Sequence, residues 1–366
     1  GYSNYPDITG LPEFRSAAHG WLKRSFKISD THINPDTQIL PLNGTREGLF
    51  LAAQIAPQKE NGLVLIPNPF YQVYAAAALA SNAEPMYMRA SIETNFLPDL
   101  DAISEDQYQR CQCFFLCSPA NPQGAVAEKQ YLTKLLAKAR HYNFIVLLDE
   151  CYSEIFDRKL EASPPPSMLE CVPENEMDDA PFIVFHSLSK RSNLSGLRSG
   201  FCTGGKTIMN RFLALRQIAG PQCPTPAQRA AALAWGDDEH VADNRALYQQ
   251  KFDIAEAIFG NDFGFYRPAG GFFLWLNVGD SVGATKHIWS SSGIKVLPGA
   301  FLARDETLED RTSYNPADAY IRVALVNPIE QTDAALRKLH DSLSSYAAKS
   351  PKPSRATTQL ETRASQ

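Results

Sequence analysis

Long apolar runs, basic runs and internal repeats are all missing from this sequence of 366 residues. No stretch is apolar over the roughly 20 residues that a membrane-spanning helix needs. The 35 basic and 40 acidic residues give a net charge of −5, and no segment is rich in lysine or arginine. This balance argues against nucleic acid or an anionic membrane as the main partner. Without a repeat of about 20–50 residues, solenoids and propellers are excluded as well.

Cysteines are few, and their spacing is that of neither a disulfide framework nor a zinc site. The chain has seven, an odd number, and Cys111, Cys113 and Cys117 fall in the apolar run CQCFFLC. Alternation along a buried strand explains this run better than a metal site does, so we expect no bound metal. The start, GYSNYPDITG, has neither the basic residues nor the apolar core of a secretory signal. We therefore expect a protein of the reducing cytoplasm.

What the sequence does contain is an ordinary globular composition, 44% hydrophobic and 20% charged, with four continuous apolar runs. The runs are GLVLIPN (62–68), CFFLCSPAN (113–121), NFIVLLDE (143–150) and PFIVFHSLS (181–189). Such runs are typical of strands that are buried on both faces of a parallel sheet. Residues 125–142 have the periodicity of a helix with a basic end. The alternation predicts an α/β fold with a mostly parallel, doubly wound sheet.

The composition changes near residue 225, which predicts a second, smaller α+β domain. A long helical stretch is followed there by strand-like segments at 270–278 and 320–326. The tail has no large apolar residue apart from Leu360. We expect three parts: a large domain over 30–225, a small domain over 1–29 and 226–349, and a disordered tail over 350–366.

The polar residues that end the predicted strands should lie close together. In a parallel sheet, ligands bind beyond the carboxyl ends of the strands. Those ends carry Asn121, Asp149, Tyr152 and the segment Ser187–Lys190. We therefore expect one binding site at this edge of the sheet.

Lys190 follows a predicted buried strand, in the segment SLSKRSNLSGLRSGF (187–201). An unpaired ammonium is costly to bury there. A Schiff base with pyridoxal phosphate (PLP) would remove the charge and make the nitrogen useful in catalysis. Ser187 and Arg198 could then bind the phosphate. Taken alone, Lys190 is more simply a lysine that begins a helix and reaches solvent.

Asp149 ends the run NFIVLLD, where a carboxylate needs a cationic partner or several hydrogen-bond donors. A protonated pyridine nitrogen is such a partner, and the pairing keeps the ring an effective electron sink. Tyr152 and Asn121 could donate to the phenolic oxygen of the ring. The alternative for Asp149 is a helix N-cap after a strand.

Two further segments fit a flat, phosphorylated ring. NGTREGLF (43–50) places a Gly-Thr turn before a helix, where free N–H groups and the positive dipole end suit a phosphate. Tyr71, in PNPFYQVY, follows another strand end and could stack on the ring. Core packing explains Tyr71 equally well.

Taken together and in this order, these motifs resemble the aspartate-aminotransferase family, class I/II, of fold-type-I PLP enzymes. The resemblance spans roughly residues 5–345, and such an enzyme moves an amino group from an amino acid to a 2-oxo acid by ping-pong chemistry. The motifs are NGTRE (43–47), NPxG (121–124), DExY (149–152), SxSK with GLR (187–198), PxGGFF (268–273) and YIRV (320–323).

The resemblance implies a role for each matching residue. Lys190 would carry the cofactor and shuttle the proton, Asp149 would pair with the pyridinium, and Tyr71 would stack on the ring. Tyr152 completes the predicted catalytic set with Lys190 and Asp149. Contacts to the ring hydroxyl and the phosphate would come from Asn121, Tyr152, Gly44, Thr45, Arg46, Ser187 and Arg198.

Arg322 in YIRV would bind the substrate α-carboxylate, with Asn121 beside it. A planar guanidinium grips a carboxylate bidentately and a lysine cannot, although an ordinary arginine on a surface strand is the alternative. Tyr5 in YPDITGLPEFR would reach the phosphate of the neighbouring subunit, so the resemblance implies a homodimer with shared active sites. The family normally has an N-terminal arm before this tyrosine, whereas this sequence begins at Gly1, almost inside the motif.

Within the family, LPLNGTREGLF and SLSKRSNLSGLRSGF are most similar to the N-succinyldiaminopimelate aminotransferases of bacterial lysine synthesis. This similarity implies glutamate as amino donor and N-succinyl-2-amino-6-oxopimelate as acceptor. Two other functions stay open: a PLP-dependent C–S lyase that performs β-elimination, and a PLP-sensing domain of a transcription regulator. The regulators carry a winged-helix module that is not seen here, and the net charge does not suit DNA.

Overall fold

A seven-stranded sheet organises the larger part of the computed structural model, which describes residues 3–307 and 313–349. The strand order is β1-β7-β6-β5-β4-β2-β3. The strands are β1 (Ile39–Leu42), β2 (Leu63–Asn68), β3 (Glu84–Arg89), β4 (Cys111–Cys117), β5 (Ile145–Asp149), β6 (Phe182–Ser187) and β7 (Gly200–Gly204). Strands β2 to β6 run parallel, and β7 is antiparallel to both β6 and β1. The predicted α/β fold with a mostly parallel sheet is confirmed.

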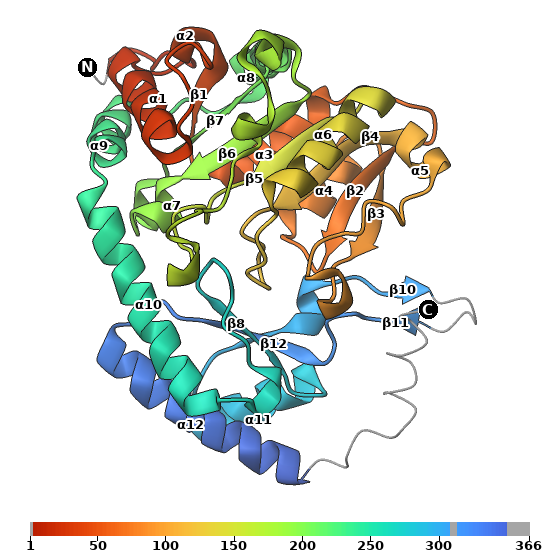
Figure 1. Cartoon of the computed structure of the whole chain (residues 1–366), viewed down its shortest axis with the longest axis vertical. Coiled ribbons are helices and arrows are strands. Elements are labelled where there is room, and N and C mark those ends of the chain that lie inside the picture. The colour runs from red at the N-terminus through yellow and green to blue at the C-terminus, as the bar shows by residue number, and fades with distance from the viewer. Residues whose placement is uncertain (1–2, 308–312, 350–366) are drawn as a thin grey trace.

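Helices cover both faces of this sheet (Figure 1). One face carries α3 (Thr45–Ala52), α4 (Val73–Ala80) and α8 (Lys206–Ala219). The other carries α1 (Pro12–Phe26), α6 (Lys129–Tyr142) and α9 (Thr225–Gly236). The short helix α2 (Pro35–Gln38) leads from α1 into β1, and the short helices α5 (Glu105–Arg110) and α7 (Leu188–Arg191) lie between strands. Because both faces are covered, every residue of β2, β4, β5 and β6 is buried, which explains the continuous apolar runs in the sequence.

Helix α1 packs on the large domain, which corrects the expected assignment of residues 1–29 to the small one. The ring of Trp21 in α1 lies 4.8 Å from that of Trp235 in α9 and 5.9 Å from that of Phe201 in β7. All three rings belong to one core with the sheet. The periodicity of α1 predicts an apolar face but does not say which domain covers it. Helix α9 shares this core, so the small domain begins after residue 236.

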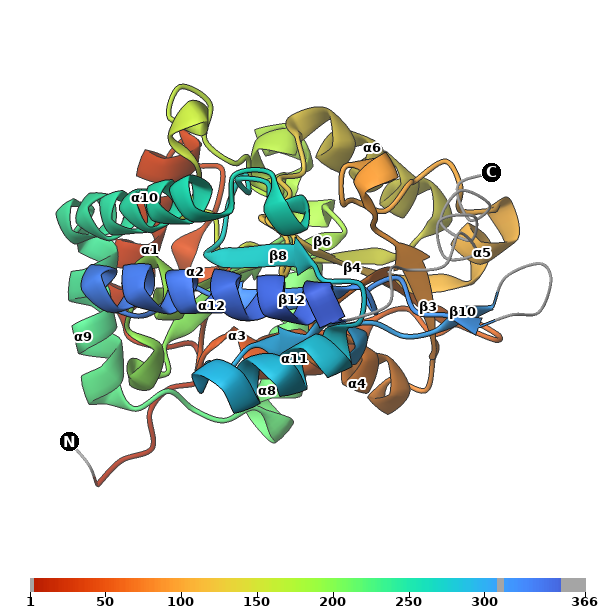
Figure 2. The ribbon, with the colours of Figure 1, turned by 90° about the horizontal axis from the view of Figure 1, so that it is seen from below.

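A three-stranded antiparallel sheet forms the small domain, in the order β8-β12-β9. Its strands are β8 (Phe273–Asn277), β9 (Leu297–Pro298) and β12 (Tyr320–Ala324). Helices α10 (Glu239–Phe259), α11 (Ser281–Ser292) and α12 (Ile329–Lys349) pack on one of its faces (Figure 2). Alternate residues of a strand point to opposite faces. Ile321 and Val323 therefore pack on the helices, while Arg322 faces the large domain.

A two-stranded ribbon, β10 (Glu306–Thr307) and β11 (Ser313–Tyr314), links the domains. Arg89 at the end of β3 donates to Glu306 with an N···O distance of 2.6 Å. Within the described residues, no helix is long and apolar enough to cross a membrane. The tail 350–366, predicted to be disordered, lies outside them.

Candidate active site

A cavity of about 470 Å³ lies between the two domains, at the carboxyl ends of the parallel strands. Its small-domain wall includes Phe273, Leu297 and Arg322. Ten of the predicted site residues line it: Thr45, Arg46, Tyr71, Asn121, Asp149, Tyr152, Ser187, Lys190, Arg198 and Arg322. Residues that lie far apart in the sequence therefore meet at the edge of the sheet where ligands bind in α/β folds.

Lys190 lies in the one-turn helix α7 that follows β6, and burial lowers the pKa of its ammonium. No carboxylate lies within 4.0 Å of Nζ among the described residues. Nζ instead lies 5.0 Å from the ring centre of Phe272 and 5.9 Å from that of Tyr152. A buried amine without a close counter-charge is biased toward its neutral, nucleophilic form.

Asp149 ends β5 and is 5% exposed. Its Oδ1 accepts a hydrogen bond from the backbone N–H of Cys151 (3.2 Å), and its Oδ2 accepts one from the hydroxyl of Tyr74 (3.1 Å). Burial raises the pKa of Asp149, whereas the hydrogen bonds from Cys151 and Tyr74 oppose that rise. Such a carboxylate gains stability from a cation in the cavity.

Gly44 and Arg198 form a cradle at the start of α3. Gly44 has φ +81°, and a Cβ atom at this position would lie 2.1 Å from Nη2 of Arg198. That nitrogen donates to the carbonyl of Asn43 (3.2 Å), and Nη1 donates to the carbonyl of Ser195 (3.1 Å). The glycine thus lets a guanidinium approach the free N–H groups of a helix N-terminus, which is an arrangement suited to a phosphate.

Ser187 caps α7, because its Oγ accepts from the backbone N–H of Ser189 at 3.1 Å. Its hydroxyl hydrogen remains able to donate into the cavity. Asn121 and Arg322 face each other across the domain boundary: Nη1 of Arg322 donates to Oδ1 of Asn121 at 2.8 Å. The guanidinium of Arg322 also lies 4.4 Å from the ring centre of Phe273, which holds it at the cavity wall.

Arg46 departs from the arrangement expected of a phosphate ligand. Its side chain is exposed, and Nε donates to the hydroxyl of Tyr71, whose ring centre lies 5.8 Å away. Arg46 thus lies on the ring that was predicted to stack on the cofactor, at the mouth of the cavity. Tyr5 is 90% exposed and does not line the cavity of its own chain.

Two residues that contact the predicted site were missed in the sequence. Tyr74 lies in the first turn of α4, three residues after Tyr71, and donates to Asp149. Cys151, the variable position of the DExY motif, lines the cavity and places Sγ 3.1 Å from Oγ1 of Thr45. Tyr74 lies close to the predicted Tyr71, since the two rings meet edge to face with centres 5.7 Å apart, but no spacing rule pointed to it because Tyr71 precedes the helix. For Cys151 the only signal was its place between two predicted site residues.

A model of the family described as aminotransferase class I and II matches residues 1–327. The chain belongs to this family. Class I and II aminotransferases depend on PLP, so the chain is a PLP-dependent aminotransferase that acts on small molecules. The residues of the cavity fit this cofactor independently of the family match. It offers a buried amine, a buried carboxylate and a glycine-lined cradle beside an arginine.

The chain is similar over most of its length to several known aminotransferases. The LL-diaminopimelate aminotransferase of Dehalococcoides mccartyi is 30% identical over 341 residues, which cover 92% of this chain and 82% of the relative. An aminotransferase structure from Neisseria meningitidis is 36% identical, with a TM-score of 0.83, and the match covers 94% of this chain and 85% of that one. AspB of Helicobacter pylori is 31% identical with the same TM-score, over 95% and 86% of the two chains.

A structure described as a probable N-succinyldiaminopimelate aminotransferase, from Thermus thermophilus, shares the fold of this aminotransferase. Its TM-score is 0.78, the match covers 90% of this chain and 84% of that one, and the sequences are 21% identical. At this identity the likeness concerns the fold alone.

Proposed function

We propose that this aminotransferase transfers the amino group of an acidic amino acid, such as glutamate, to a 2-oxo acid, with Lys190 as the cofactor-binding residue. The observation that carries the proposal is that Lys190 and Asp149 line one cavity while no ion pair within 4.0 Å joins them. When bound, PLP supplies the electron sink that stabilises negative charge at the substrate Cα. Asp149 would hold the proton on the ring nitrogen, and Lys190 would move the proton at Cα.

The remaining residues would hold and orient the reactants. Arg198, with Gly44, Thr45 and Ser187, would bind the phosphate, and Tyr71 would lie against the ring. Asn121 and Tyr152 would donate to the ring hydroxyl. Arg322 would take the substrate α-carboxylate, and Asn121, which already contacts Arg322 in the structure, would keep its guanidinium in place.

The position of Arg46 favours a substrate with a second carboxylate. The cavity contains three arginines, of which Arg198 is assigned to the phosphate and Arg322 to the α-carboxylate. Arg46 remains at the mouth of the cavity, and among the described residues its side chain donates a hydrogen bond only to the neutral hydroxyl of Tyr71. A second carboxylate on the substrate would pair with this third cation. Glutamate has such a group, and so does the acceptor N-succinyl-2-amino-6-oxopimelate.

A homodimer completes the proposal. Tyr5 is 90% exposed in the single chain. The apolar side chains of Ile218 (91%) and Leu79 (68%) are exposed as well, and a partner subunit could cover them. In a dimer, Tyr5 would reach the phosphate bound to the partner. The reducing cytoplasm stays the expected compartment, because all seven cysteines are free thiols.

The test of the chemistry is spectroscopic. The PLP-saturated protein should show the visible absorbance of a lysine-bound cofactor, and Lys190→Ala should lose it. Lys59→Ala should keep it, because Lys59 lies before the amino end of β2, away from the cavity, where its Nζ donates to the carbonyl of Tyr142. Rapid mixing with a panel of amino acids then shows which ones convert PLP to pyridoxamine phosphate. A wild-type protein without the band would refute the role of Lys190. Pyruvate and ammonia released from cystathionine without any oxo acid would identify a C–S lyase instead.

The test of the substrate class is Arg46→Gln. It should raise KM for glutamate on the order of tenfold, because an interaction of about 1.4 kcal/mol is lost, and should leave KM for alanine unchanged. An equal change for both amino acids would exclude Arg46 as the reader of a second carboxylate.

A further inference from the structure

Arg191 directly follows Lys190 in the sequence, but its side chain points away from the cavity into a buried pocket. It is 2% exposed. Its guanidinium lies 5.6 Å from the ring centre of Trp21 in α1 and 5.1 Å from that of Trp235 in α9. Two indole rings therefore hold the cation by cation–π contact in a site that water barely reaches.

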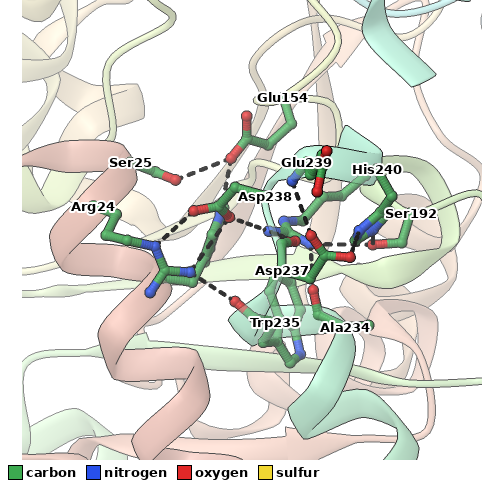
Figure 3. Close-up of polar contacts among 12 residues, drawn as sticks. Arg24, Ser25, Glu154, Ser192, Ala234, Trp235, Asp237, Asp238, Glu239 and His240 are labelled. Carbon is green, nitrogen blue, oxygen red and sulfur yellow. Dashed lines mark hydrogen bonds and ion pairs between the residues drawn. The ribbon is translucent and has the colours of Figure 1, made fainter. Parts of the chain in front are cut away.

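The same guanidinium ties helix α7 to the junction of α9 and α10. Nη1 donates to the carbonyl of Ala234 at 2.7 Å, and Nη2 donates to the carbonyl of Asp237 at 3.1 Å. Nη2 also pairs with Oδ1 of Asp238 at 2.6 Å. Figure 3 shows these three residues gathered where one helix ends and the next begins. A cation at this point also suits the negative end of the α9 dipole.

The first turns of α10 hold the lysine-bearing turn by two more contacts. Nε2 of His240 lies 2.8 Å from Oγ of Ser192, the C-cap residue directly after α7 (Figure 3). Nδ2 of Asn244 lies 3.2 Å from the carbonyl oxygens of both Lys190 and Arg191 and donates to them. The backbone of Lys190 is thus bonded directly to α10.

The same stretch of α10 also holds the segment that follows Tyr152. Nη1 of Arg245 donates to the carbonyl of Glu154 at 3.1 Å and to its Oε2 at 3.2 Å. Oε1 of Glu154 accepts from Ser25 at 2.9 Å and from the indole N–H of Trp21 at 2.8 Å. Figure 3 shows Glu154 and Ser25 beside the Asp237–His240 cluster.

The far end of α10 belongs to the small domain. Phe252 and Phe259 pack in the core that contains Leu274 of β8 and Ile321 of β12. Lys251 donates to the carbonyl of Leu325, directly after β12, at 2.9 Å. Figure 1 shows α10 running from α9 down to α12. One rigid helix thus connects the strand that carries Arg322 to the turns that carry Lys190 and Tyr152.

We propose that Arg191 is a positioning residue for Lys190, because it fixes the lysine-bearing turn to the start of α10 and so couples the place of the amine to the small domain. The inference rests on the proposed role of Lys190 as the cofactor-binding residue. Arg191 itself touches neither the cavity nor a substrate, so its effect passes through the backbone of α7 and the contacts of Asn244.

Arg24 provides a matched control for Arg191. It bonds to the same junction from the outside, through Asp238 (2.6 Å) and the carbonyl of Trp235 (2.9 Å), but it lies on α1 and forms no hydrogen bond or ion pair with the described residues of α7. Arg191→Met and Arg24→Met therefore both weaken the junction, while only the first releases the lysine-bearing turn. Arg191→Lys keeps the charge and should restore part of the function.

The experiment compares these variants as PLP-saturated proteins. Melting temperature should fall in both Met variants, but only Arg191→Met should shift the pH midpoint of the lysine-bound cofactor's absorbance. Its kcat should fall on the order of tenfold with a smaller change in KM, since misplacement by about 1 Å costs up to about 100-fold. Equal loss of melting temperature in both, with unchanged midpoint and kcat, would overturn the proposal.

Asn244→Ala keeps the test decisive if Arg191→Met does not fold. It removes only the two bonds to the carbonyls of Lys190 and Arg191, and it should shift the absorbance midpoint in the same direction by a smaller amount. An unchanged midpoint in Asn244→Ala would refute the coupling. A wild-type protein without any lysine-bound band would instead refute the proposed role of Lys190, so the two failures are distinguishable.

Discussion

Oδ2 of Asp149 accepts a hydrogen bond of 3.1 Å from the hydroxyl of Tyr74. The ring of Tyr74 stacks on that of Phe115, with the ring centres 4.5 Å apart. The tyrosine is 1% exposed, and burial raises the pKa of its phenol well above the usual value. It therefore stays a donor at all ordinary pH values. The carboxylate at the end of β5 is thus oriented by a hydrogen-bond donor that stays neutral.

Tyr74→Phe should weaken the site without changing its shape. The lost hydrogen bond to a charged acceptor is worth about 1.5–3 kcal/mol, so PLP affinity should fall roughly tenfold or more. Removing this donor also lets the pKa of Asp149 rise further. A carboxyl group with a higher pKa is neutral more often at low pH, so the defect should be larger at pH 6 than at pH 8. Titration of the apoprotein with PLP at both pH values measures this.

Tyr108→Phe is the matched control for that change. Tyr108 is equally buried, and its hydroxyl donates to the carbonyl of Leu100 at 2.7 Å, away from the cavity. The control should lose a similar amount of stability and keep its PLP affinity. If both variants bind PLP like the wild type, the bond from Tyr74 to Asp149 does not contribute to the cofactor site.

Gly44→Ala tests the cradle at the start of α3. The new Cβ atom would meet Nη2 of Arg198 at 2.1 Å, so the guanidinium has to leave its place. We expect PLP affinity to fall on the order of tenfold or more, because a charge-assisted contact to the phosphate is displaced. Gly279→Ala has nearly the same positive φ (+80°) and no heavy atom within 4 Å of its Cβ. It should cost similar backbone strain, about 1–2 kcal/mol, without any effect on PLP binding.

Four of the seven large-domain strands, β2, β4, β5 and β6, and most of the candidate site were predictable because both follow from short-range patterns. Continuous apolar runs mark strands that are covered on both faces, and polar residues at their ends mark the edge where ligands bind. Asp149 and Lys190 were found in this way, and the structure places both in one cavity. Asp149 ends β5 and Lys190 lies in the short helix after β6, so each could be located from its own strand.

The features that were missed depend on packing between distant segments. The sequence of α1 shows an apolar face, but the choice between two domains is made by Trp235 and Phe201, which lie far along the chain. The direction of the Arg46 side chain is set by the hydroxyl of Tyr71, and no spacing rule predicts that contact. The inward guanidinium of Arg191 depends likewise on two indole rings from separate helices.

Glu150, the neighbour of Asp149, points to the opposite side of the sheet and is 1% exposed. Its Oε1 accepts from the backbone N–H of Met168 at 3.0 Å, and its Oε2 lies 3.3 Å from Nε2 of His186, which is also 1% exposed. Burial raises the pKa of Glu150 from its usual 4.5 to about 8 and lowers that of His186 from 6.5 to about 3. Both groups are therefore neutral in the folded protein at pH 7.

Glu150→Gln should flatten the pH dependence of stability above pH 6.5. Between pH 4.5 and about 8, Glu150 is ionised in the unfolded chain and protonated in the folded one, so stability falls as pH rises. Burial of neutral His186 makes stability rise with pH, but only between pH 3 and 6.5. Of these two groups, only Glu150 therefore changes the stability between pH 6.5 and 8. One proton gives a slope of about 1.4 kcal/mol per pH unit, and an uncharged amide removes it. Urea unfolding at pH 6.5, 7, 7.5 and 8 measures the slope, and equal slopes in the two proteins would mean that folded Glu150 is already a carboxylate.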